Sequence, residues 1–182
     1  MIVRSHARMH SHGISGATMH AVRISVDVVM ERVPLQNRWA SERWQPAAVV
    51  PAGMPAPAEV SIERLPGVDT HERWCVHGHS VELHPVEVEG YFLNLTAPEP
   101  KAFVMWRMHG DGEPPARPVV VTLSYNEAAR MLDGGEQVDS VPLAAPLADL
   151  MRPFIATHYR PEPRRKVRRN DPFAADQGRR GR

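Results

Sequence analysis

Apolar and polar residues alternate where patterned sequence begins, at about residue 20. Within 22–28 every second residue is apolar: Val22, Ile24, Val26 and Val28. A period of two places these side chains on one face of an extended strand and the residues between them on the other. The pattern therefore predicts a half-buried β-strand.

Short apolar runs continue the β pattern as far as residue 124. A strand is expected at 46–50, after a loop that carries Trp39 and Trp44. Glycine, proline and aspartate then separate successive runs, which favours antiparallel strands joined by short links. Gly78 is expected to form one of the turns between strands. The predicted strands are 60–65, 72–76, 79–84, 86–96, 102–108, 117–124 and, after a helix, 136–143.

Two helices are predicted in the C-terminal part of the patterned region. Ser124 and Glu127 have the spacing of a capping box, which predicts a short helix that Gly134 closes. A second helix over 146–159 contains Pro153 and has apolar residues at steps of three and four. These are Leu147, Leu150, Met151, Phe154 and Ile155. The expected fold is α+β: an antiparallel β-sheet or half-open barrel covered by this C-terminal amphipathic helix.

Charge divides the chain unevenly. Residues 159–182 carry nine Arg/Lys and three acids, a net charge of +6, so the remaining 13 basic and 18 acidic residues carry −5. We expect a disordered leader at 1–19, one α+β domain at 20–159 and a basic disordered tail at 160–182. Such a tail can fold back on the acidic domain or reach an acidic partner.

The tail concentrates its charge in a short cluster. Nucleic-acid binding is the less favoured function for it, because nucleic-acid readers add stacking aromatic residues or a recognition helix and the tail offers a single aromatic residue. We favour a docking segment for a protein partner. The alternative is a solvated tail that binds nothing. The residues that we expect to dock are Arg164, Arg165, Lys166, Arg168, Arg169 and Phe173.

The sequence contains little that indicates catalysis. It has no G-x-S-x-G, Walker or G-x-G-x-x-G motif, so we expect no enzymatic activity, cofactor or metal. Cys75 is the single cysteine, which excludes an internal disulfide and suits a reducing cytoplasm. No apolar run reaches 18 residues, so no membrane span is expected.

One group of residues keeps a metal-binding alternative open. On one continuous strand Cys75, His77 and His79 would share a face and could ligate a metal ion. Gly78 argues against this reading, because a turn there would direct the imidazoles into solvent.

Several stretches in combination resemble an uncharacterised bacterial family, domain-of-unknown-function family 3305. They are "VVMERVPLQNRWASERWQPAAVVP", "ELHPVEVEGYFLNLTAPEPKAFVMWRM", "VVVTLSYNEAARMLDGGEQVDSVPLAAPL" and "FIATHYRPEPRRKVRRNDPF". Genes of that family commonly lie beside those for a molybdenum- or tungsten-dependent formate dehydrogenase. The resemblance therefore implies an accessory or assembly protein whose partner is a formate dehydrogenase subunit or maturation factor. Trp39, Trp44, Tyr91 and Asn94 fit its recurring pattern and suggest a binding surface. A stable small subunit of a larger oxidoreductase is the alternative.

Overall fold

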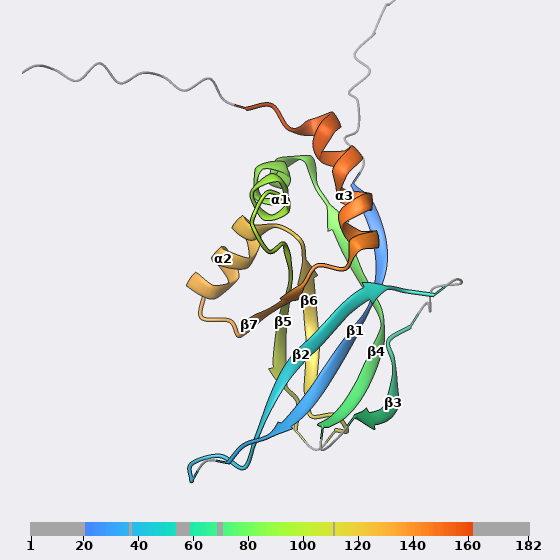
Figure 1. The fold of residues 1–182 in the computed structure, drawn as a ribbon, viewed down its shortest axis with the longest axis vertical. Coiled ribbons are helices and arrows are strands. Elements are labelled where there is room, and N and C mark those ends of the chain that lie inside the picture. Colours follow the sequence, from blue (N-terminus) through green and yellow to red (C-terminus); the bar gives the residue numbers. More distant parts are fainter. Residues whose placement is uncertain (1–20, 37, 54–58, 69–70, 111, 162–182) are drawn as a thin grey trace, which may run out of the picture.

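Two antiparallel sheets and three α-helices make up the fold in the computed structural model (Figure 1), which describes residues 21–161 apart from 37, 54–58, 69–70 and 111. The predicted leader and residues 162–182 of the predicted tail lie outside the described residues. One sheet has the strand order β2-β1-β4-β3 and the other β6-β5-β7. The strands are β1 (Val22–Pro34), β2 (Glu42–Pro51), β3 (Ser61–Val68), β4 (His71–Leu83), β5 (Lys101–Met108), β6 (Ala116–Thr122) and β7 (Val138–Pro142). The helices are α1 (Val88–Leu95), α2 (Tyr125–Asp133) and α3 (Ala145–His158).

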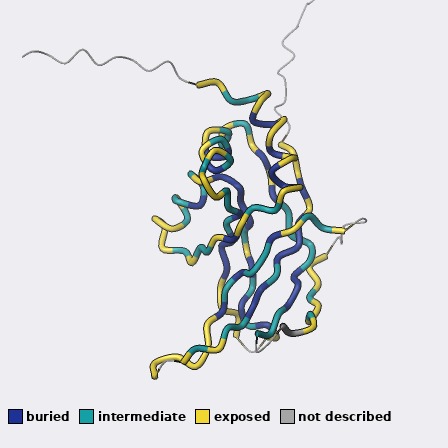
Figure 2. Tube along the Cα trace, in the orientation of Figure 1, coloured by how far each residue is buried: buried dark blue, intermediate teal, exposed yellow. Residues whose placement is uncertain are grey.

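The two sheets face each other across a common core (Figure 2). Alternation along β1 and β4 turns Val26, Val28 and Val76 inwards, where they join Val104 and Trp106 of β5 in one hydrophobic cluster. The expected α+β class with antiparallel strands is confirmed, in the form of two open sheets. The outer face of the four-stranded sheet carries the other residues of β1 and β4, and the candidate site lies there.

The C-terminal helix occupies a different place from the one predicted. Helix α3 forms as expected and buries Leu147, Met151 and Phe154, with Pro153 inside it. It packs against α1 at one end of the sheets, where the Phe154 ring meets Tyr91 edge-on at 6.0 Å between centroids. The expectation that it covers a sheet was wrong, because the inner face of each sheet is already buried by the other.

Helix α2 begins as the sequence indicates. The Ser124 hydroxyl accepts a hydrogen bond from the Glu127 backbone N–H at 3.1 Å. The glutamate does not complete the box, since its carboxylate accepts from Thr122 and the Ser124 N–H donates to the Thr122 hydroxyl. At the other end Gly135, with φ at +82°, follows Gly134 in a Schellman closure.

Residues 88–95 form helix α1 where a strand was predicted. The alternation of valine and glutamate at its start imitates a strand. The helix instead buries Gly90, Tyr91 and Asn94 on one face. A Cβ on Gly90 would lie 2.1 Å from the Ser124 hydroxyl, so glycine permits the close approach of α1 to the start of α2.

Gly78 lies within a strand instead of forming a turn. Strand β4 is continuous from His71 to Leu83, and its register against β1 shifts by one residue between Val26 and Val28. Gly78 has φ at +86°, the left-handed conformation found in the type of β-bulge that carries a glycine. The predicted turn was wrong because a left-handed glycine serves a bulge as well as a turn.

Candidate functional site

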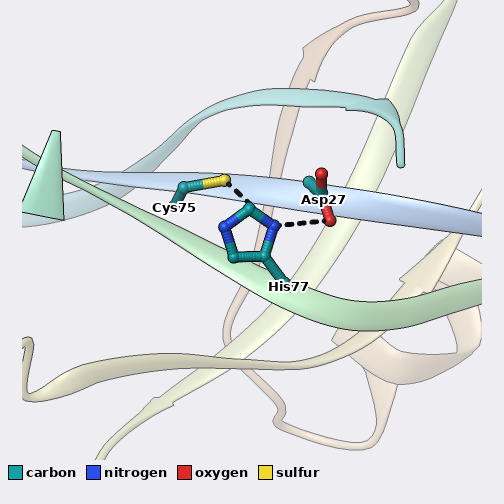
Figure 3. A group of neighbouring side chains, drawn as sticks. All are labelled: Asp27, Cys75 and His77. Carbon is teal, nitrogen blue, oxygen red and sulfur yellow. Dashed lines mark hydrogen bonds and ion pairs between the residues drawn. The ribbon is translucent and has the colours of Figure 1, made fainter. Parts of the chain in front are cut away.

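The bulge on β4 brings three different metal-binding side chains together on the outer face of the four-stranded sheet (Figure 3). Cys75 and His77 come from β4, and Asp27 comes from β1 opposite the bulge. The Cys75 Sγ lies 3.8 Å from His77 Nδ1, and Asp27 Oδ1 lies 3.0 Å from the same nitrogen. All three ligand atoms lie within 4.8 Å of one another. A thiol, an imidazole and a carboxylate therefore converge.

Asp27 is buried without the hydrogen bonds that usually accompany a buried carboxylate. The residue is 8% exposed, and its Oδ1 makes no hydrogen bond. The His77 Nδ1 lies 3.0 Å from this oxygen, which is an ion-pair distance when the imidazole is protonated. Glu31, four residues along the same strand and equally buried, accepts hydrogen bonds from Gln45 and Arg73. Both oxygens of Glu31 are thus hydrogen-bonded, whereas Oδ1 of Asp27 has no hydrogen bond and only the His77 imidazole at ion-pair distance.

The electrostatics of the cluster favour a cation. Burial raises the pKa of the Cys75 thiol to about 11, and the charges of Asp27 and Glu63 act in the same direction. The Glu63 carboxylate of β3 also lies 3.7 Å from His77 Nε2, on the far side of the imidazole ring. Two acids thus flank a thiol and an imidazole, with no arginine or lysine paired to Asp27 among the described residues.

His79 does not join this cluster, contrary to the metal-binding alternative of the sequence. The bulge reverses the alternation after Gly78, so His79 faces the same side as Val81 and Leu83. It lines a cleft of about 330 Å³ between β4 and β6, beside Val119 and Val121. Burial lowers the pKa of this imidazole, against the opposing charge of Asp27, and its Nε2 is buried without a hydrogen bond.

The aromatic residues expected to bind a partner fall into two groups. Trp39 is 83% exposed in the loop between β1 and β2, with the Arg38 guanidinium 4.7 Å from its ring centroid. Trp44 is buried on β2 and packs against Trp74 at 5.1 Å between centroids. Burial of Trp44 removes it from the surface that a partner can touch.

Tyr91 is also buried, at 1% exposure. Its hydroxyl donates to the Glu82 carbonyl at 3.2 Å and accepts from the His84 N–H at 3.1 Å, which ties α1 to the end of β4. Asn94 is 2% exposed on the same helix. Both residues therefore hold the fold together and offer no surface to a partner in this conformation. The basic docking residues Arg164 to Arg169, and Phe173, lie outside the described residues.

A family model described as a protein of unknown function, DUF3305, matches residues 25–168. The chain belongs to the DUF3305 family. The match agrees with the resemblance that the sequence suggested. No curated protein and no solved structure matches this DUF3305 chain. No helix among its described residues is both long and apolar enough to cross a membrane.

Asp27 is the site residue that the sequence did not reveal. It stands in an alternating strand, "SVDVV", where a polar residue normally faces solvent. Its partners follow about fifty positions later, and the contact depends on the register of β1 against β4. The cysteine and histidine were visible as a pair, but the third ligand required the structure.

Proposed function

We propose that this DUF3305 chain is a cytoplasmic, non-catalytic accessory protein that docks on a protein partner. The partner that we propose is a subunit or maturation factor of a molybdenum- or tungsten-dependent formate dehydrogenase. The partner's identity comes from the family resemblance, and the cytoplasmic setting suits a chain with a single cysteine. One observation carries the docking role, namely the exposed aromatic residue at the tip of the β1–β2 hairpin.

That hairpin extends past the other strands at the end of the molecule away from the helices (Figure 1). Its loop is closed by a hydrogen bond from the Leu35 N–H to the Ser41 carbonyl at 2.9 Å. Trp39 lies in this loop, 83% exposed, under the Arg38 guanidinium. Tryptophan and arginine are enriched among the residues that dominate binding energy at protein interfaces. A tryptophan on a projecting hairpin can enter a partner's pocket without any change in the core.

The charge of the chain supports a second contact. The cluster from Arg164 to Arg169 follows the described residues after a short interval, and the rest of the chain is acidic. Arginine pairs with carboxylates in bidentate geometry, so the cluster suits an acidic surface on the partner. A two-point contact of hairpin and tail raises avidity, because the second binding event becomes intramolecular.

Affinity purification of the tagged full chain from its native host tests the proposal. We expect mass spectrometry to recover a formate dehydrogenase subunit or maturation protein. Trp39→Ala should reduce that recovery at least about tenfold, since the loss of an interface hot spot weakens binding by about 2 kcal/mol or more. Val86→Ala is the matched control, because Val86 is 82% exposed and lies beside the helices, far from the hairpin.

A second variant tests the tail. Serine at the five basic positions, Arg164, Arg165, Lys166, Arg168 and Arg169, should weaken recovery and reduce its dependence on salt. Recovery of no dehydrogenase subunit or maturation protein would refute the proposal. Equal recovery with Trp39→Ala and Val86→Ala would remove the hairpin from it. A fixed stoichiometry that persists through purification would instead identify a permanent subunit.

A further inference from the structure

We propose that Asp27, Cys75 and His77 bind one Zn²⁺ ion, through the Oδ1, Sγ and Nδ1 atoms, with a water molecule as the fourth ligand. The proposal does not depend on the docking role. It rests on three observations: the spacing of the donor atoms, the Asp27 oxygen that has no hydrogen bond, and the position of Glu63 beside the far nitrogen of His77.

The spacing suits a tetrahedral ion. Zinc bonds of about 2.3 Å to sulfur and 2.0–2.2 Å to nitrogen or oxygen place neighbouring ligand atoms about 3.4 to 3.6 Å apart. The structure has 3.8 Å between Cys75 Sγ and His77 Nδ1, and 3.0 Å between His77 Nδ1 and Asp27 Oδ1. Changes of a few tenths of an ångström bring these two separations to the tetrahedral values. The Cys75 Sγ and Asp27 Oδ1 atoms lie within 4.8 Å of each other, and side-chain rotation brings them closer. The thiolate and imidazole favour zinc over magnesium and calcium, which prefer oxygen ligands alone.

The unpaired oxygen is the second observation. A buried carboxylate oxygen without a hydrogen bond is unfavourable unless another group or an ion compensates its charge. Asp27 Oδ1 is buried, points into the cluster and makes no hydrogen bond, although Glu31 on the same strand is fully paired. A cation between Asp27, Cys75 and His77 supplies the missing partner. The ion would compensate a buried charge that no hydrogen bond of the fold reaches.

The third observation concerns the tautomer of His77. Glu63 Oε2 lies 3.7 Å from the Nε2 atom, so a metal ion bound at Nδ1 leaves the Nε2 proton facing this carboxylate. The lone pair of Nδ1 is then directed at the space shared with Asp27 and Cys75. Zinc-binding histidines commonly direct their second nitrogen at a carboxylate in this way, which fixes the ring orientation and strengthens the ligand. Glu63 is therefore a positioning residue for the site.

The bulge explains how a sheet can bring these three ligands together. Without the extra residue, Cys75, His77 and residue 79 would follow one face in a straight row, and each would point away from the sheet. The bulge places both His77 and Gly78 opposite Asp27 and re-aims the imidazole towards β1. A Cβ at position 78 would lie 2.7 Å from the Glu59 carbonyl oxygen, so the bulge also depends on glycine.

The test is a cobalt titration of the reduced, metal-free full chain. Co²⁺ replaces Zn²⁺ at such sites, and a thiolate ligand then gives a charge-transfer absorption in the near ultraviolet. Because Cys75 is the single cysteine, that absorption can arise from no other residue. We expect it to saturate at one Co²⁺ per chain and to disappear when one equivalent of Zn²⁺ is added.

Variants separate the proposed ligands from their neighbours. Cys75→Ser should abolish the thiolate absorption. His77→Ala and Asp27→Asn should each weaken Zn²⁺ affinity more than about 100-fold, beyond the tenfold to 100-fold loss typical of an outer-shell change. Glu63→Gln should fall within that outer-shell range. His79→Gln is the matched control, because His79 faces the cleft and should leave affinity unchanged.

The histidines of the leader need a separate control, since His6, His10 and His12 can also bind metals. Alanine at these three positions should leave the thiolate absorption and its stoichiometry intact. No thiolate absorption at saturating Co²⁺, with Cys75 shown to be reduced, overturns the proposal. This outcome needs only the unmodified chain, so it holds even if a variant fails to fold. An affinity that falls with His79→Gln and not with Asp27→Asn overturns the assigned ligand set.

Discussion

The helical end of the molecule and the outer face of the four-stranded sheet both bury polar side chains, but the hydrogen bonding of those side chains differs. At the helical end, Asn94 donates to the Lys101 and Leu123 carbonyls and accepts from the Lys101 N–H, at 2.7 to 2.9 Å. The Tyr91 hydroxyl both donates and accepts a hydrogen bond. On the sheet, Asp27 retains a buried oxygen without a hydrogen bond.

The difference separates two uses of a buried polar group. A group whose hydrogen bonds are all made inside the fold contributes to stability, and its removal leaves other groups unpaired. A buried charge without a hydrogen bond adds nothing comparable, and where a thiol and an imidazole converge on it, as at Asp27, it points to a cation. We infer that Tyr91 and Asn94 are structural, and that Asp27 is held ready for a cation.

The largest effect should come from Asn94→Ala. The change leaves two carbonyls and one N–H of the backbone without partners at the junction of α1, β5 and β6. We expect the free energy of unfolding to fall by about 3 kcal/mol, because buried unpaired groups cost about 1–3 kcal/mol each and water can repay part of this. Urea unfolding followed by tryptophan fluorescence measures it.

Asn126→Ala is the control for that experiment. Asn126 is partly exposed in the first turn of α2, and its change should alter stability by less than about 0.5 kcal/mol. If Asn94→Ala costs no more than the control, the polar contacts at the helical end are not structural and the comparison fails.

Tyr91 should give a smaller effect that depends on pH. Burial raises the pKa of its hydroxyl from 10.0 to about 12. The protonated form is therefore favoured in the folded state, so this stability is fully present below pH 10 and is lost as pH rises towards 12. By pH 11 the loss should reach about 1.4 kcal/mol, which corresponds to one pKa unit.

Tyr91→Phe isolates this effect. The variant loses two hydrogen bonds at every pH, but its stability should fall less steeply between pH 9 and 11 than that of the unmodified chain. The difference in slope is the measurement, because Cys75, whose pKa burial raises to about 11, titrates in the same window in both proteins. Parallel pH profiles would show that the Tyr91 hydroxyl is not held protonated by the fold.

The sequence predicted most of the elements because their patterns are local. The alternation of β1, the serine cap of α2 and the apolar face of α3 can each be read from a dozen residues or fewer. Helix α1 could not be predicted from its local sequence, because Val88 and Glu89 continue a strand-like alternation. Its helical form is tied to the contact of Gly90 with Ser124, which lies 34 positions away.

The candidate site was likewise only partly predictable from local sequence. Cys75 and His77 were visible as neighbours, but Gly78 has two local readings, and the register of β1 against β4 decides between them. That register also selects Asp27 and places His79 on the other face. Trp39 was predicted on a loop and lies there, whereas Trp44 was expected beside it and is buried against Trp74. Patterns of residue type do not determine which of two tryptophans a sheet will cover.

The smallest effect should come from Asp27→Asn in the metal-free chain, and Glu31→Gln is its matched control. The two acids occupy the same face of β1 with nearly equal burial. Glu31→Gln weakens charged hydrogen bonds with Gln45 and Arg73, so it should cost about 1 to 2 kcal/mol. Asp27→Asn relieves a buried charge that has no hydrogen bond at Oδ1 but loses the ion pair with His77. The two effects oppose each other, so stability should change by less than about 0.5 kcal/mol.

Zinc should reverse the order of stability of these two variants. Saturating Zn²⁺, at about 100 times its dissociation constant, should add about 2.7 kcal/mol to the stability of the unmodified chain and of Glu31→Gln. It should add far less to Asp27→Asn, because that variant lacks a ligand. A large loss for Asp27→Asn without metal would place Asp27 with Asn94 as a structural residue. An equal gain from zinc in both variants would separate the unpaired oxygen from metal binding.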